Sequence, residues 1–415
     1  MAVGELRAWL DHAQPMDFPY DAVLDEYGLV GKHFVSEDVL TALAAARELL
    51  GHLSDRDQSA ELLSRFLQVA LDKYDGQYDY ASYTALALLP MPSVDDARGE
   101  PASALQRRDR LLVQLIADTV QFELDAVDGR SRLVRQMEPD ARTVNKRIRL
   151  ATRAAMPSLA RLDLASAVFD PDPQRGARQL CAAVNSGLTE GDRLILQLSA
   201  MPVYVLHDEH LFIRVLQMFE ATFAVLAVHL TDAVQDLTNS NGMAAASHLA
   251  VADATLRESA PLFSLIATMQ PEAFRSFRAF TEGASAIQSR NYKILESVCR
   301  KPDPDRLSSA AYTSTPEIRE RILGGNPTLD DAFVSACTTG RLDIARRHQI
   351  EHAMRSFSAT LQRWRHTHYR LAVHMIGDSP GTGYTVGTAY LASVRSIEVF
   401  RSIDRSTGGE QHEAV

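Results

Sequence analysis

Apolar residues recur at intervals of three and four along most of the chain, and runs that alternate apolar with polar residues are few. This spacing gathers apolar side chains on one face of a helix, so we predict an all-α protein. Four helices are expected in the N-terminal part, near residues 36–52, 59–73, 104–127 and 131–155.

A boundary is predicted at the segment DPDPQRG, residues 170–176, because repeated X-Pro restriction, glycine and charge disfavour a continuous helix there. We expect a helical N-terminal region of unknown role (1–178), a second helical domain (179–403) and a disordered tail (404–415). A proline-rich polar stretch, 301–327, is expected to form an excursion between core helices.

The composition narrows the class of partner. Asp and Glu number 53 against 43 Lys and Arg, a formal net charge of −10. Such a chain is a poor fit for nucleic acid or an anionic membrane face, and a small molecule or a protein is the expected partner. No apolar run of membrane-spanning length, signal peptide or paired cysteine spacing is apparent, so a cytoplasmic protein is expected.

A basic run occupies the expected helix near residues 131–155. Its members are Arg142, Lys146, Arg147, Arg149 and Arg153. Basic residues at this density on a helix usually form a solvated face, so we assign the run no functional role.

One predicted helix carries a histidine on an otherwise apolar face. The face consists of Met354, Phe357, Leu361, Trp364, His368, Leu371 and Met375. Folding would bury the His368 imidazole among large apolar side chains, and its nitrogens would then need partners. A backbone carbonyl is one candidate partner. Iron is the other, since a neutral imidazole in an apolar slot suits a porphyrin. The spacing alone leaves both open.

Three separated segments point to one particular protein family. They are HDEHLFI (207–213), PEAFRSFRAFTEGASAIQSRNYKILE (271–296) and WRHTHYRLAVHMIGDSPGTGYTVGTAYL (364–391). They resemble consecutive landmarks of the tryptophan 2,3-dioxygenase family, in that family's order, within about residues 185–400. The resemblance implies that 179–403 is a helical-bundle haem domain, that the cofactor is haem b, and that the protein is a haem-dependent oxidoreductase.

The resemblance assigns three residues to the haem. His368 matches the histidine of W-R-x-x-H, which is the iron ligand in the family. Trp364 opens the same motif, and Ser285 falls where the family brings a serine–glycine turn over the haem. His366 lies on a different side of the helix and is not the ligand candidate.

Four further residues match the substrate end of the family's site. Arg278 corresponds to the arginine that holds the substrate carboxylate, a task suited to a planar, permanently charged fork. Thr382 corresponds to a threonine at the amino-acid end, and Phe212 to a phenylalanine near the distal pocket. Leu216 stands where the family has its distal histidine, so no catalytic residue is assigned. This loss indicates an altered contact to the aromatic ring.

An aromatic segment of the N-terminal region could replace that contact, or could be structural packing; its tyrosines are Tyr78, Tyr80 and Tyr83. The expected function is a haem-dependent oxygenase that uses dioxygen on an aromatic amino acid, tryptophan or an indole derivative. The alternatives are a monooxygenase or peroxide-dependent hydroxylase of tyrosine or a substituted indole, and a haem-binding helical protein without turnover. The resemblance also implies a homodimer or homotetramer.

Overall fold

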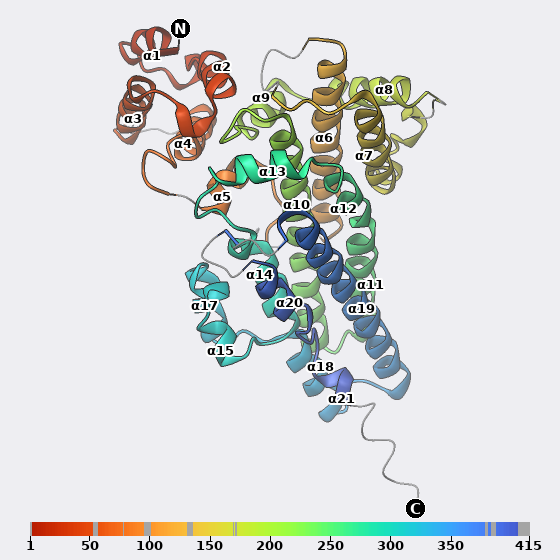
Figure 1. The fold of residues 1–415 in the computed structure, drawn as a ribbon. Helices are drawn as coiled ribbons and strands as arrows, with labels where there is room; N and C mark the ends of the chain where they lie inside the picture. Colours follow the sequence, from red (N-terminus) through yellow and green to blue (C-terminus); the bar gives the residue numbers. More distant parts are fainter. Residues whose placement is uncertain are drawn as a thin grey trace, which may run out of the picture. The chain divides into compact units, whose positions relative to one another are not determined.

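The computed structural model describes residues 2–405 except 53–56, 78, 95–100, 131–135, 169, 171, 378–380 and 383–386. Every regular element in these residues is a helix (Figure 1), and the only β-type pairing among them is an isolated bridge between Gln136 and Leu206. The all-α prediction is therefore confirmed.

The chain divides into two compact units. The first comprises residues 1–90, 111–218 and 264–285, and the second comprises 91–110, 219–263 and 286–415. Three helices contribute residues to both units: α6 (Pro101–Val127), α10 (His207–Thr238) and α12 (Ala260–Ile266).

The other elements of the first unit are α1 (Ala2–Leu10), η1 (Pro15–Asp17), α2 (Tyr20–Val30), η2 (Lys32–Phe34), α3 (Glu37–Gly51), α4 (Gln58–Ala70), α5 (Tyr80–Tyr83), η3 (Leu86–Leu88), α7 (Ala141–Arg161), η4 (Ala165–Val168), α8 (Pro173–Ser186), α9 (Glu190–Leu198) and α13 (Pro271–Arg278). Those of the second unit are α11 (Gly242–Glu258), η5 (Ala286–Gln288), α14 (Arg290–Cys299), α15 (Pro304–Leu307), α16 (Ala310–Thr313), α17 (Pro316–Leu323), α18 (Leu329–Thr338), α19 (Ile344–Ile376), α20 (Thr388–Arg395) and α21 (Ser402–Arg405).

Three of the four helices predicted in the N-terminal part match α3, α4 and α6 closely. The fourth begins later than predicted, at Ala141, because Asp140 caps it by accepting from the Thr143 amide at 2.7 Å. The stretch 301–327 contains three short helices, α15 to α17. Of the predicted tail, residues 404 and 405 belong to α21 and 406–415 lie outside the described residues.

Helices α1 to α4 of the first unit share one hydrophobic cluster that includes Leu6, Leu43 and Phe66. Within it the Tyr27 hydroxyl donates to the Ala70 carbonyl at 2.8 Å, which satisfies a polar atom that burial would otherwise leave without a partner. The N-terminal helices therefore share a core to which Leu198 and Met201 also contribute.

The basic run of α7 is only partly solvated. Arg142, Lys146, Arg149 and Arg153 are exposed as predicted, but Arg147 is 1% exposed. The prediction was wrong for this residue because it lies on the apolar side of α7, where carboxylates of the first unit neutralise it.

The central helix α10 corrects another expectation. An 18-residue window within it has a mean hydropathy of 1.8, which is long and apolar enough to cross a membrane, yet 89% of that window is buried inside the protein. Such burial is expected for the core helix of a large helical domain.

In the second unit α11 packs along α19. Gly242 lies close to α19, since a Cβ there would lie 3.3 Å from Ile350 Cδ1. Further along, Asp253 accepts hydrogen bonds from Ser356 at 2.7 Å and Thr360 at 2.6 Å. These contacts fix the helix that carries His368.

Candidate functional site

The motif that opens α10 is a structural clamp within the first unit. His207 Nε2 lies 3.2 Å from Glu123, and Asp208 forms an ion pair with Arg147 at 2.5 Å and accepts from the Gln270 amide at 2.6 Å. Arg147 also pairs with Glu123 at 2.8 Å. Because these groups are buried, removing one partner would leave an uncompensated charge, at a cost of about 3–5 kcal/mol.

The third residue of the motif, Glu209, fixes the backbone before α10. Its carboxyl oxygens accept from the amides of Val203 at 2.7 Å and Tyr204 at 3.0 Å, and from the Tyr83 hydroxyl at 3.2 Å. Burial raises the pKa of Glu209 to about 8, although these hydrogen bonds favour its ionised form. Tyr83 thus ties α5 to the start of α10.

This carboxyl group gives a testable pH dependence. The folded protein holds the Glu209 proton up to about pH 8, whereas an exposed glutamate releases it near 4.5. Its contribution to stability is therefore complete at low pH and declines as the pH rises from about 4.5 to about 8. Urea unfolding would be measured at several pH values across this range. We expect the free energy of unfolding to fall less steeply with rising pH in Glu209→Gln than in the wild type.

The same variant should lose about 1–3 kcal/mol at the acidic end, because the new amide group faces a backbone N–H. Glu272→Gln, which changes an exposed glutamate of α13, is the matched control and should keep the wild-type slope. An unchanged slope in Glu209→Gln would show that Glu209 titrates normally.

Two candidate substrate residues stand out along α10. From residue 206 to residue 230 every side chain is buried except those of His210, Phe212 and Leu216, which are partly exposed. His210 lies 3.1 Å from Asp118, whereas Phe212 and Leu216 are one helical turn apart on one face. This face of an otherwise buried helix is therefore partly accessible to solvent.

The other candidate residues of the first unit lie near Phe212. The ring of Phe277, which precedes Arg278 at the end of α13, has its centroid 5.4 Å from that of Phe212. Burial lowers the pKa of Arg278, so its guanidinium is partly desolvated. Ser285 is partly buried and follows Ala284, which shares a hydrophobic cluster with Phe212.

In the second unit, the predicted apolar face of α19 is confirmed by its burial. Met354, Phe357 and Leu361 are fully buried. The next positions on that face, Trp364 and His368, are only partly exposed, and His366 is exposed on another side. The buried face therefore opens at the level of His368.

The His368 imidazole lies among aromatic rings and makes no hydrogen bond with any residue in the described part of the chain. Its centroid is 5.3 Å from the Trp364 ring and 6.4 Å from Phe263, the latter stacked. Burial lowers the pKa of His368 to about 4, so the ring is neutral at neutral pH. Trp364 Nε1 is buried and has no hydrogen-bond partner among the described residues.

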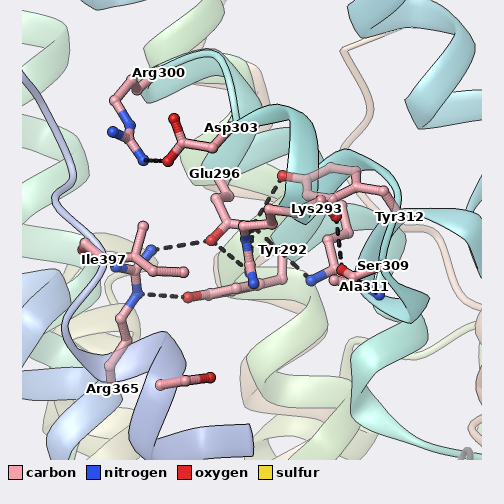
Figure 2. A network of polar contacts seen from close by, with 12 residues as sticks. Tyr292, Lys293, Glu296, Arg300, Asp303, Ser309, Ala311, Tyr312, Arg365 and Ile397 are labelled. Atoms are coloured by element: carbon pink, nitrogen blue, oxygen red, sulfur yellow. Dashed lines mark hydrogen bonds and ion pairs between the residues drawn. The ribbon is translucent and has the colours of Figure 1, made fainter.

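Arg365, between these two residues, behaves differently (Figure 2). It donates to the Tyr292 hydroxyl at 2.8 Å and to the Ile397 carbonyl at 2.7 Å, and it pairs with Glu296 at 3.4 Å. Burial would raise the pKa of Glu296, but the charges of Lys293, Arg306 and Arg365 lower it to about 2. The motif therefore combines a structural arginine, which is held by three protein groups, with two rings that form no hydrogen bond with the described residues.

These residues fit a haem group. A neutral imidazole without a protein partner can give a nitrogen lone pair to iron, and a buried indole N–H beside it needs an acceptor that the described residues do not supply. The described residues contain no group of three His, Cys, Asp or Glu side chains that could hold a metal ion. Thr382 is partly buried in the turn after α19, and its neighbours 378–380 and 383–386 lie outside the described residues.

Three residues that shape these sites were not singled out by the sequence: Phe263 was not named, Arg147 was given no functional role, and Tyr83 was only one of three tyrosines that could replace the ring contact or be structural packing. Arg147 shares the helical spacing of buried Val144 and Ile148, a signal that the sequence does contain. Tyr83 and Phe263 meet their partners only through the fold, and Tyr78 lies outside the described residues.

Comparison with known proteins gives a consistent result. No family model matches the chain. A tryptophan 2,3-dioxygenase of Anaeromyxobacter dehalogenans is 27% identical over 251 residues, covering 53% of this chain and 95% of that relative. The tryptophan 2,3-dioxygenase of Herpetosiphon aurantiacus is 27% identical over 220 residues, which cover 45% of this chain and 83% of that relative. The one of Xanthomonas campestris pv. campestris is 23% identical over 227 residues, which cover 47% of this chain and 76% of that relative. The chain is a divergent relative of the tryptophan 2,3-dioxygenases over about half of its length.

Proposed function

We propose that the chain is a haem-dependent oxygenase that uses dioxygen to oxidise the ring of an aromatic amino acid, with tryptophan or an indole derivative as substrate. One observation carries the proposal: in W-R-x-x-H the arginine is held by protein partners, whereas His368 makes no hydrogen bond with the described residues and Trp364 Nε1 is buried without a partner among them. The names of the relatives supply the reaction class.

Each candidate residue has one task in this proposal. His368 would hold the iron through a ring nitrogen, with Trp364 and Ser285 completing the haem surroundings. Haem, when bound, supplies the activation of dioxygen. Arg278 would hold the substrate carboxylate, Thr382 would contact the amino-acid end, and Phe212 and Leu216 would border the ring.

Positioning is the protein's main contribution. Leu216 offers no hydrogen bond and no proton acceptor, so the ring would be oriented by its carboxylate anchor and by shape. Because no acid or base is assigned at the ring end, the described residues are proposed to bind, orient and exclude water rather than to transfer a proton.

The test is the fate of isotopically heavy dioxygen in the purified, haem-loaded protein with tryptophan. We expect both heavy atoms in one product, with ring opening. One heavy atom would indicate a hydroxylase instead, and a haem-loaded protein that yields no oxidised product from a panel of aromatic amino acids would indicate a binding protein.

A homodimer or homotetramer, which the resemblance implies, and a cytoplasmic location, which the cysteine usage favours, belong to the same proposal. Mass measurement of the purified holoprotein in solution would decide the oligomeric state.

A further inference from the structure

The first unit contains a group of side chains that we call the ring wall: Tyr83, Phe212, Leu216 and Phe280. They pack together around buried Val203, Ile213 and Ala284. Tyr83 lies on α5, in the part of the chain that the resemblance does not cover, and its ring centroid is 6.3 Å from that of Phe212. The N-terminal region thus reaches two candidate substrate residues.

The ring wall presents carbon rather than hydrogen-bonding groups. The Tyr83 hydroxyl is its one polar atom, and it donates to Glu209, which is itself fully buried. Phe280 is held by a stack on Tyr204 with centroids 4.7 Å apart. At the position where a distal histidine could have bonded an indole N–H, Leu216 adds only methyl groups.

We propose that the ring wall sets the ring selectivity of the enzyme, with Tyr83 as a specificity-determining residue, and that it selects rings without hydrogen-bonding substituents. This inference rests on the proposed function, because it takes Phe212 and Leu216 to border the substrate. A ring hydroxyl placed against the wall would lose its water without gaining a partner, whereas a methyl group of similar size would not.

The first test needs only the wild-type, haem-loaded chain. Dissociation constants would be measured from haem absorbance shifts for tryptophans methylated or hydroxylated at the same ring carbon. We expect the methylated compound to bind about 10-fold more tightly or better. Equal binding, or tighter binding of the hydroxylated compound, would overturn the inference.

The second test uses variants of the wall. In Tyr83→Leu, loss of the ring beside Phe212 should improve the binding of bulkier ring-substituted tryptophans relative to tryptophan by about 10-fold. Phe280→Leu, a partly exposed position of the same wall, should change the same ratio and guards against failure of the first variant to fold. Tyr20→Leu, the same substitution at a partly buried tyrosine of α2 that lies outside the wall, is the matched control and should leave the ratio unchanged.

These outcomes separate the two proposals. A wild-type chain that takes up no haem, or whose haem spectrum no aromatic amino acid shifts, contradicts the proposed function and the ring selectivity with it. A haem-loaded chain that binds tryptophan but shows unchanged ratios in Tyr83→Leu and Phe280→Leu contradicts the ring wall alone.

Discussion

His368→Ala is expected to abolish haem binding while leaving the fold intact. The imidazole makes no hydrogen bond with the described residues, so its removal breaks no protein contact of that kind, and alanine favours the helix. An iron that loses its axial nitrogen loses its main attachment, and we expect haem occupancy to fall at least about 10-fold. Absorbance of the reconstituted protein, together with its far-ultraviolet circular dichroism, measures both.

His366→Ala is the matched control, because His366 is exposed and lies only two residues away on the same helix. It should keep full occupancy. Free imidazole added to His368→Ala should restore a haem spectrum by filling the space left by the side chain. Unchanged haem occupancy in His368→Ala, or an equal loss in His366→Ala, would contradict the assignment of the ligand.

The helical fold could be predicted because burial imposes a period on the sequence that can be seen locally. The face of α19 illustrates this, since Met354, Phe357 and Leu361 are buried at the expected spacing. The partner of a buried charge, by contrast, cannot be read from a periodic pattern in the sequence. Arg147 is acceptable inside the first unit only because Glu123 and Asp208 come from other helices, and a local pattern cannot show that pairing.

The sequence also predicted part of the candidate site. Motif matching located His368, Arg278 and Phe212, whose roles stay predictions. It gave no physical reason for the H-D-E motif, whose carboxylates clamp the start of α10 to distant segments of the first unit. The tie from Tyr83 to Glu209 joins residues 126 positions apart, and only the fold brings them together.

The difference between Arg365 and His368 illustrates what the structure adds. Both belong to one short motif, from which the sequence predicted a function for His368 and none for Arg365. Arg365 is held by three protein groups, so its loss would destabilise the second unit whatever the protein does. His368 has no such role, so the effect of its substitution reports on ligand binding.

Arg278→Ala is expected to weaken binding of tryptophan by about 10- to 100-fold, the effect of losing a charge-assisted hydrogen bond to the carboxylate. Tryptamine, which lacks the carboxylate, should bind the variant and the wild type almost equally. Partial burial strengthens this expectation, because a desolvated guanidinium gains more from an anionic partner than an exposed one does. Haem absorbance shifts for the two compounds provide the measurement.

Two further variants separate the effect of the positive charge of Arg278 from that of its planar shape on the binding of tryptophan. Arg278→Lys keeps the charge but loses the planar fork, so its affinity for tryptophan should fall between those of wild type and Arg278→Ala. Arg275→Ala removes an exposed arginine of the same helix, which pairs with Glu272 at 3.0 Å, and should change neither affinity. If Arg278→Ala weakened tryptophan and tryptamine equally, Arg278 would act on the shape of the first unit and not on the carboxylate.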